Sequence, residues 1–309
     1  VTITVSSGDD GAPNEDQDLG CLCQFTSSSS QSDWKGSNSW SGRGYFPSFP
    51  ATSPWVTAVG ATMGPNTGDP EIACQSQLGG LITTGGGFST YYPVPSWQEE
   101  TTSYYFSHLS AGETPTSGYN SQGRGYPDIS LIGVEYQVII DGDPYSLYGT
   151  SASSPVIAAF VSLVNAARIQ NNMSAIGFLN PTLYAVGLNN TLGLGNVYNA
   201  SFNDVTSGHN RCCSYSNINN PSGATCCASG FYTTAGWDPV TGWGSVFYPD
   251  FAAIFDVAAP YTRDDDDGSS SDGLTDGEVA GVVVGVLAAA ALISFGVYSV
   301  VGAGAVSAP

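Results

Sequence analysis

The sequence predicts an α/β domain with a mainly parallel sheet flanked by helices, and two observations support this. Apolar strand segments alternate with Gly- and Ser-rich loops and lead into one apolar helix, a pattern typical of α/β domains. In addition, 41% of the 309 residues are hydrophobic, which is enough to build a substantial core.

The strand candidates are distributed over the first half of the chain. An alternating run covers residues 1–5, a loop region covers residues 6–55, and an apolar strand is expected near Trp55–Ala61. A long turn-rich stretch then leads to paired strand candidates at Asp128–Ile132 and Glu135–Ile140. Because the chain opens inside a strand, without an initiator Met or a signal peptide, we expect an N-terminal part of the natural product to be missing.

A buried helix is expected over Pro155–Arg168. Its residues are good helix formers and apolar nearly all round, and its proline stands in the first turn, where the missing N–H is tolerated. The preceding Gly149-Thr150-Ser151 predicts a glycine turn that exposes Ser151 at the helix start. Free N–H groups and the positive end of the helix dipole favour the negative charge of acyl transfer there. The competing interpretation of such a serine is a simple N-cap.

The charge balance excludes one class of partner. The chain has 26 acidic and 6 basic residues, for a formal net charge of −20, whereas nucleic-acid binding needs clustered Lys and Arg. We therefore expect no nucleic-acid partner. The acidity is compatible with work at low pH and also with simple solubility.

The cysteines indicate an oxidising compartment. Six of the seven form close pairs in polar loops, which favours disulfides; zinc is the competing interpretation, but there is no C-x-x-C motif and only two histidines are present. Acceptor sequons at Asn172, Asn189 and Asn199 agree with secretion. The cysteines are Cys21, Cys23, Cys212, Cys213, Cys226, Cys227 and the leftover Cys74, which is either free or paired outside this chain.

The C-terminal region predicts a membrane attachment. Residues 262–278 hold the acidic Asp264–Asp267 tract and a Ser-rich run, typical of an exposed stalk, and residues 279–309 are uncharged and largely apolar. That last segment is long enough to span a bilayer and also fits a glycosylphosphatidylinositol signal. We expect residues 1–261 to form the folded domain on the non-cytosolic side, at the cell surface or at an acidic vacuolar or lysosomal membrane.

Several segments along the chain, in addition to the turn Gly149–Pro155 (GTSASSP), resemble the sedolisin (serine-carboxyl peptidase) family, in particular its tripeptidyl peptidase branch, and they occur in family order. They are Ser7–Ala12 (SGDDGA), Phe46–Pro54 (FPSFPATSP), Tyr92–Glu100 (YPVPSWQEE), Gly123–Asp128 (GRGYPD), Gly177–Pro181 (GFLNP) and Gly236–Gly244 (GWDPVTGWG).

This resemblance implies a subtilisin-like fold, peptide or protein substrates and a serine nucleophile served by carboxylates. It assigns the nucleophile to Ser151 and an oxyanion-hole aspartate to Asp9, which donates a hydrogen bond only while protonated. It also implies a Glu and an orienting Asp four residues apart, upstream of Asp9. No glutamate in this chain has an aspartate four residues later, so we expect the chain alone to be catalytically incompetent.

The resemblance also implies one structural Ca²⁺, a hard cation that prefers oxygen ligands. The matching groups are the Asp204 and Asp238 carboxylates and the Val205, Thr234 and Gly236 carbonyls. Thr234 stands where relatives commonly have glycine, which puts its carbonyl in question. The resemblance further leads us to expect the cysteine-rich loop Cys212–Cys227 to pair with Cys21 or Cys23.

Two other functions compete with this one. An ordinary histidine-based subtilisin-like protease would need His108 or His209 as its base. A non-catalytic cell-surface protein that keeps the fold is the second alternative, because fold does not guarantee function. The resemblance does not distinguish between two activities: removal of tripeptides from the N-terminus of a peptide, and cleavage within a chain as by an endopeptidase.

Overall fold

A four-stranded sheet lies at the centre of the structure, a computed structural model that places Val1–Val257 in one unit. The strand β4 (Thr57–Met63) occupies the middle of this sheet and pairs in parallel with β1 (Thr4–Ser6) and β8 (Ile129–Ile132). The short β5 (Ile72–Ala73) pairs with β4 in antiparallel orientation. The described residues are 1–16, 20–23, 45–110, 112–115, 118–192, 201–215, 217, 219–228 and 230–257.

The sheet centre is buried on both faces, as expected for parallel strands covered from two sides. The β4 residues Ala58, Val59 and Ala61 and the β8 residue Ile129 have no solvent exposure. The register places Val59 beside Ile129, so the apolar side chains of the two strands share one core. Small residues in β4 permit this close packing from both sides.

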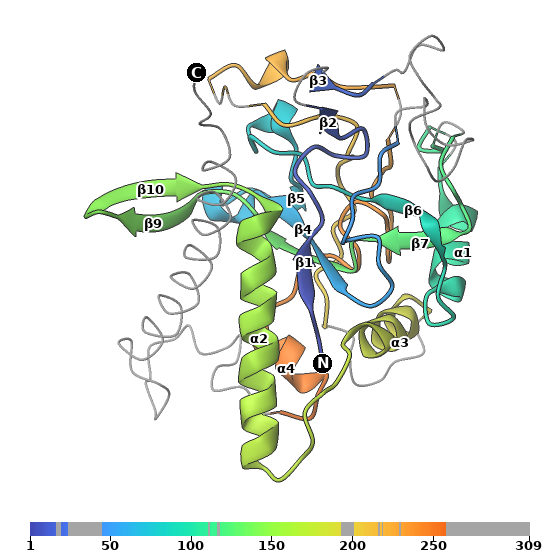
Figure 1. Ribbon diagram of the computed structural model, residues 1–309, viewed down its shortest axis with the longest axis vertical. Coiled ribbons are helices and arrows are strands. Elements are labelled where there is room, and N and C mark those ends of the chain that lie inside the picture. The colour runs from blue at the N-terminus through green and yellow to red at the C-terminus, as the bar shows by residue number, and fades with distance from the viewer. Residues whose placement is uncertain are drawn as a thin grey trace, which may run out of the picture. The chain divides into compact units, whose positions relative to one another are not determined.

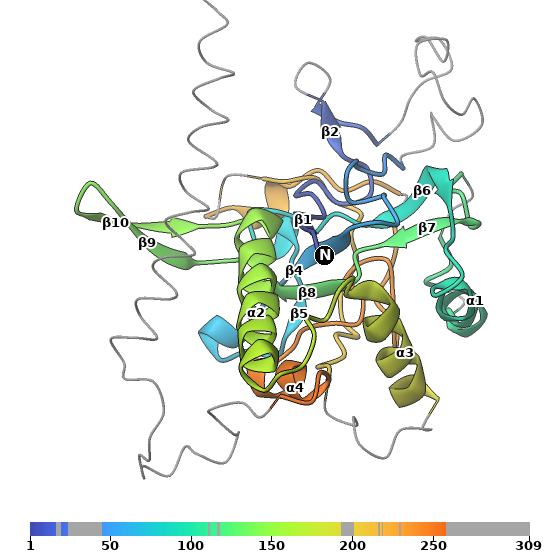
Figure 2. The same ribbon diagram turned by 60° about the horizontal axis from the view of Figure 1, so that its bottom comes forward.

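The helix α2 (Thr150–Gln170) covers one face of the sheet and contacts β1, β4 and β8 (Figures 1 and 2). The short α4 (Tyr248–Ala253) packs on it, with the Phe160 and Phe251 rings 5.9 Å apart. Among the described residues, α2 is the one helix long and apolar enough to cross a membrane. It packs against three strands of the sheet, but only six of its 21 residues are buried, namely Thr150, Ser153, Ser154, Ile157, Val161 and Val164. The helix is therefore buried on the side that faces the sheet, and the prediction of a buried helix is correct only for that side. The helix begins five residues earlier than the sequence predicted, so Pro155 lies inside it.

A buried ion pair fixes the start of β8. Arg124 and Asp128 have side chains with no exposure and an Nη2–Oδ2 distance of 2.5 Å. The Asp128 carboxylate also accepts the Ala58 N–H at 2.7 Å and the Tyr184 hydroxyl at 2.8 Å. A buried charge is tolerated only when it is paired and hydrogen-bonded in this way. The pair therefore ties β8 to β4 and to α3 (Asn180–Thr191).

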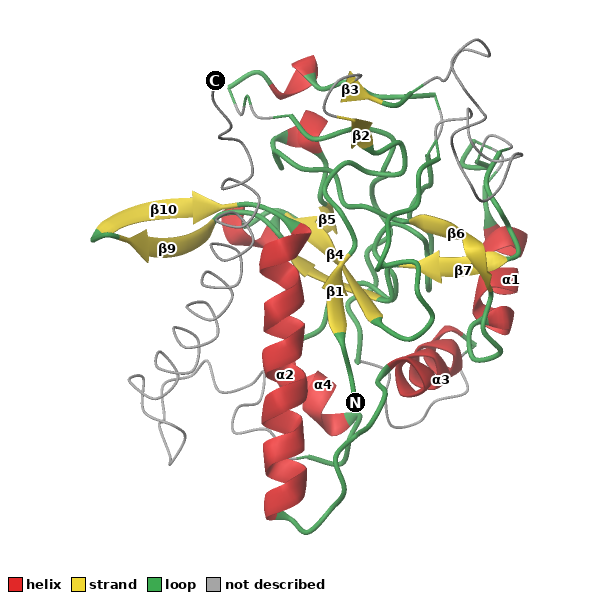
Figure 3. Ribbon diagram, viewed as in Figure 1, coloured by secondary structure: helices red, strands yellow, loops and turns green. Residues whose placement is uncertain are grey.

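The remaining strands form antiparallel pairs outside the central sheet, and loops make up much of the chain (Figure 3). The pairs are β2 (Glu15–Asp16) with β3 (Gly20–Cys21), β6 (Gly87–Pro93) with β7 (Gly123–Tyr126), and β9 (Tyr136–Ile140) with β10 (Asp143–Leu147).

These pairs limit the prediction of a mainly parallel sheet, because among the described strands only β1, β4 and β8 pair in parallel, and the one parallel contact outside them is an isolated bridge between Asp10 and Thr83. The predicted strands near 128–132 and 135–140 are present as β8 and β9, but they do not pair with each other. Instead β9 turns back through a tight hairpin to β10, which extends away from the sheet in Figures 1 and 2. The α/β class is confirmed.

Helices and aromatic rings enclose the core beyond β6 and β7. The helix α1 (Glu99–His108) contributes Tyr105, whose ring lies 6.0 Å from that of the buried Trp237. Phe88 from β6 lies 6.1 Å from the same indole ring. Short 3-10 helices complete the described elements at Pro65–Thr67, Ser76–Leu78 and Pro221–Gly223. The stalk and the hydrophobic segment predicted over residues 262–309 lie outside the described residues.

Candidate active site and metal site

The turn that presents Ser151 is attached to the end of β8. The Gly149 N–H donates to the Gly133 carbonyl at 2.8 Å, and the Ser153 hydroxyl lies 3.1 and 3.0 Å from the Leu131 and Ile132 carbonyls. These contacts fix the first turn of α2, in which Ser151 is exposed. Because Pro155 has no N–H, the Ser151 carbonyl also lacks its usual helical donor. The hydroxyl is therefore presented to solvent from a rigid base.

Asp9 lies directly against this turn although it is far away in sequence. Its Oδ1 accepts the Thr150 N–H at 2.8 Å and the Thr150 hydroxyl at 2.9 Å. Gly149 has φ 146°, and a β-carbon there would lie 3.2 Å from Asp9 Oδ2. Glycine is thus required both for the backbone conformation and for the close approach of the carboxyl group. The structure brings Asp9 and the Ser151 turn together.

The environment of Asp9 favours its protonated form. Burial raises the pKa of the Asp9 carboxyl above its usual value, the two hydrogen bonds from Thr150 oppose this, and the neighbouring Asp10 charge adds to the rise. Within the described residues, Oδ2 accepts no hydrogen bond. A proton on the Asp9 carboxyl is therefore best placed on Oδ2, where it is free to be donated.

The two histidines are engaged away from Ser151. His108 Nδ1 lies 2.9 Å from the Tyr104 carbonyl in α1, and its ring stacks on Tyr104. His209 lies beside Arg211 and Tyr232, and burial together with the Arg211 charge lowers its pKa to about 4. Neither histidine bonds to Ser151, so the described structure gives no support to a histidine-based protease.

The two aspartates proposed as calcium ligands lie in one corner of the structure. Asp238 is fully buried, and its carboxylate accepts the N–H groups of Thr234 at 3.1 Å and Thr241 at 2.8 Å. Asp204 Oδ2 accepts the Gly236 N–H at 2.7 Å. Burial raises the pKa of both carboxyls, and the Asp204 charge adds to the rise at Asp238. Although Asp204 as a residue is exposed, its charge acts on the fully buried Asp238, and a bound cation would stabilise such a pair of like charges.

The carbonyl groups assigned to this site are chemically suited to the same cation. Among the described residues, the carbonyls of Val205, Thr234 and Gly236 accept no hydrogen bond. Thr234 does not have a positive φ, so threonine can adopt its backbone conformation. Threonine in place of the glycine common among relatives therefore does not distort this segment. The donor set of carboxylates and free carbonyls therefore fits Ca²⁺, which takes six to eight oxygen ligands.

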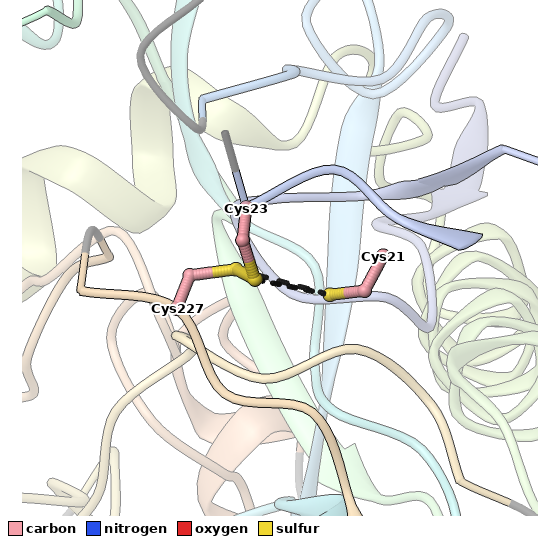
Figure 4. Close-up of side chains that lie close together, drawn as sticks. All are labelled: Cys21, Cys23 and Cys227. Carbon is pink, nitrogen blue, oxygen red and sulfur yellow. Dashed lines mark hydrogen bonds between the residues drawn. A yellow bond between two sulfur atoms is a disulfide. The ribbon is translucent and has the colours of Figure 1, made fainter. Parts of the chain in front are cut away.

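The sulfur atoms form a disulfide cluster. Cys21 pairs with Cys213, Cys23 with Cys227, and Cys212 with Cys226, which confirms the predicted link from Cys21 or Cys23 to the cysteine-rich loop. Figure 4 shows Cys21 Sγ beside the Cys23–Cys227 bond, 3.8 Å from Cys227 Sγ. The sulfurs of Cys21, Cys23 and Cys227 have the spacing of a metal cluster, but all three are bonded in disulfides.

Two residues near the site were not identified from the sequence. Thr150 anchors Asp9 through both its N–H and its hydroxyl, whereas the sequence indicates it only as part of the glycine turn. For Asp10 the sequence indicates no role, because nothing local distinguishes it from a turn aspartate. Cys74 is free and buried, and burial raises the pKa of its thiol well above the usual value, so it is a core residue.

Comparison with known proteins gives consistent matches, although no family model matches the chain. Physarolisin of Physarum polycephalum is 33% identical over 277 residues, covering 82% of this chain and 41% of that protein. Tripeptidyl-peptidase 1 of Bos taurus is 38% identical over 251 residues, covering 81% and 36%. The chain thus spans less than half the length of these relatives.

A solved structure agrees with the sequence matches. It is Pseudomonas sedolisin, a serine-carboxyl proteinase complexed with two molecules of pseudo-iodotyrostatin. The TM-score is 0.52 at 27% identity, and the match covers 82% of this chain and 55% of that one.

Proposed function

The chain belongs to the sedolisin family of serine-carboxyl peptidases, and from this we propose that it is the nucleophile-bearing part of a tripeptidyl-peptidase-like enzyme. The enzyme hydrolyses peptide bonds in acid through an acyl-enzyme on Ser151. The observation that carries the proposal is the contact of the Asp9 carboxyl with the turn that presents Ser151, at 2.8 Å from the Thr150 N–H.

The chemistry follows from this contact. Ser151 Oγ attacks the peptide carbonyl carbon while its proton passes to a general base, and the carbonyl oxygen becomes an oxyanion. A proton on Asp9 Oδ2 donates to that oxyanion, and the N-terminal end of α2 stabilises the same charge. The base returns that proton to the amine as the C–N bond breaks, and water then hydrolyses the ester and restores the Ser151 hydroxyl. Because donation requires the protonated acid, the step operates at low pH.

We assign the general base to a carboxylate outside these 309 residues. No glutamate here is followed by an aspartate four residues later, and the relatives extend well beyond the matched part. The 309 residues alone are therefore expected to be inactive.

One Ca²⁺ belongs to the proposal as a structural ion. The Asp204 and Asp238 carboxylates and the carbonyls of Val205, Thr234 and Gly236 would hold it, and the ion would offset the negative charges of the buried Asp238 and the exposed Asp204. When bound, the ion would stabilise the loops that end at Asp204 and Asp238 and take no part in the chemical step.

We further propose a secreted, membrane-attached, glycosylated protein that acts on peptides or proteins on the non-cytosolic side. The three disulfides suit that compartment. Asn172 and Asn189 are exposed, as glycan acceptors must be, and Asn199 lies outside the described residues. Attachment through residues 279–309 rests on their uncharged, apolar sequence.

The test is peptide cleavage by the full-length protein between pH 3 and pH 7. Ser151→Ala should abolish cleavage while the protein stays folded, because acylation needs the hydroxyl and alanine fits the exposed position. The matched control is Ser103→Ala on the exposed side of α1, which should leave cleavage unchanged. Cleavage retained in Ser151→Ala would remove Ser151 from its role, and its absence in the wild type would favour a non-catalytic protein.

A further inference from the structure

Asp10 lies beside the proposed oxyanion residue but points to a different part of the molecule. Neighbouring side chains on extended backbone alternate in direction. Asp9 accordingly bonds to Thr150 in α2, whereas Asp10 Oδ1 accepts the Ser214 N–H at 2.9 Å. Ser214 follows Cys213, which is bonded to Cys21. The two adjacent residues Asp9 and Asp10 thus connect the turn that carries Ser151 to the cysteine-rich loop.

The backbone on either side of Asp10 is held by hydrogen bonds to two other segments. The Thr83 N–H donates to the Asp9 carbonyl at 2.8 Å, and the Gly11 N–H donates to the Thr83 carbonyl at 2.9 Å. The Ala12 N–H reaches the Asn210 carbonyl at 2.8 Å. The bond from Ser214 to Asp10 adds a side-chain contact to these backbone bonds and joins the loop next to Asp9 to the cysteine-rich loop.

We propose that Asp10 is a positioning residue for Asp9, which holds the Asp9 loop on the disulfide-bonded segment through Ser214 and places a negative charge beside the Asp9 carboxyl. This inference rests on the proposed function of Asp9. It assigns the neighbouring aspartate two separable contributions, a hydrogen-bond acceptor and a charge.

The charge acts in a definite direction. A negative group next to a carboxyl disfavours its ionisation, and the Asp10 charge contributes to the raised pKa of Asp9. The described titratable groups whose charge interacts with that of Asp9 are Asp10 and the thiol of Cys74, and the thiol stays neutral because burial raises its pKa. Asp10 forms no ion pair within the described residues, so its charge is not cancelled by a base there. Asp10 therefore extends the pH range in which Asp9 keeps its proton.

Two substitutions separate the contributions in the full-length protein. Asp10→Asn keeps an oxygen that accepts the Ser214 N–H but removes the charge, whereas Asp10→Ala removes both. In the kcat/KM profile, the limb at higher pH should move down by about half a unit in Asp10→Asn, with kcat at the optimum unchanged. Asp10→Ala should show the same shift and a kcat about fivefold lower at every pH, with KM unchanged, because the loop is looser. Asp143→Asn, an exposed aspartate in the β9–β10 hairpin, is the control for charge removal and should leave the profile unchanged.

A second measurement does not depend on cleavage. The ¹³C shift of the Asp9 carboxyl, assigned with Asp9→Asn, reports its titration directly, and Asp10→Asn should lower the midpoint by the same half unit. An unchanged midpoint in folded Asp10→Asn protein overturns the inference, whatever the activity. A wild-type protein that cleaves no peptide at any pH overturns the proposed function instead, so the two failures are distinguishable.

Discussion

Asp9→Asn tests the proposed oxyanion donor most directly, because it changes the titration of the group while keeping its contacts. The amide oxygen can accept the Thr150 N–H and hydroxyl that now reach Oδ1 at 2.8 and 2.9 Å. The amide nitrogen then takes the place of Oδ2 and donates at every pH. The variant should therefore lose the limb at higher pH that the wild type owes to ionisation of Asp9.

The size of the effect follows from the number of donors. Losing one oxyanion donor lowers kcat by roughly 10²–10³, or about 2.7–4 kcal/mol, and this is the loss expected for Asp9→Ala. Asp9→Asn retains a donor of different strength and geometry, so its kcat at acidic pH should fall only about tenfold, close to 1.4 kcal/mol. The assay is kcat between pH 3 and pH 7 for the wild type and both variants.

The folded state gives an independent check with a definite sign. The pKa of Asp9 is raised on folding, so the protonated carboxyl is favoured in the native state. This preference stabilises the native state at low pH, and the contribution is lost as the pH rises through the folded pKa. Asparagine never ionises. Asp9→Asn should therefore melt higher than the wild type near pH 7 and at a similar temperature near pH 3. A melting difference that is the same at both pH values, or an unchanged high-pH limb in kcat, would refute the reasoning.

Three further predictions concern other parts of the molecule. Calcium should raise the melting temperature of the folded domain through binding to the native state, and Asp238→Ala should remove the effect. Equal melting curves in chelator and in excess calcium would show that the domain has no calcium site. Gly149→Ala should destabilise the domain by about 1–2 kcal/mol in denaturant unfolding, because φ 146° is disfavoured for alanine and its β-carbon would lie 3.2 Å from Asp9 Oδ2; an unchanged midpoint would contradict this. A phospholipase specific for glycosylphosphatidylinositol should release the ectodomain from intact cells if residues 279–309 are an anchor signal and leave it bound if they span the bilayer, whereas recovery of the unprocessed chain in the soluble cytosolic fraction would exclude both.

Local patterns predicted the elements whose cause is local. The apolar run after Gly149 predicted α2, and the apolar segment near Trp55–Ala61 predicted β4, because burial of a continuous apolar surface leaves its period in the sequence. The α1 and α3 helices were not predicted, since Glu99–His108 and Asn180–Thr191 are rich in Thr, Ser, Tyr or Asn and carry weak helical periodicity. Their formation depends on packing, as for Tyr184 against Asp128.

By itself, the sequence determined the chemistry available to this protein: a serine at a helix start, aspartates in Gly-rich turns, and closely spaced cysteines that favour disulfides. Only the tertiary structure decided which of these groups meet. Asp9 and Thr150 are 141 residues apart, and three particular disulfides were selected from the fifteen pairings that six cysteines allow. Contacts between distant residues leave no local period in the sequence, because they are fixed by how the β1–β4–β8 sheet and α2 pack together. The roles proposed for Asp10 and Thr150 therefore rest on the folded structure alone.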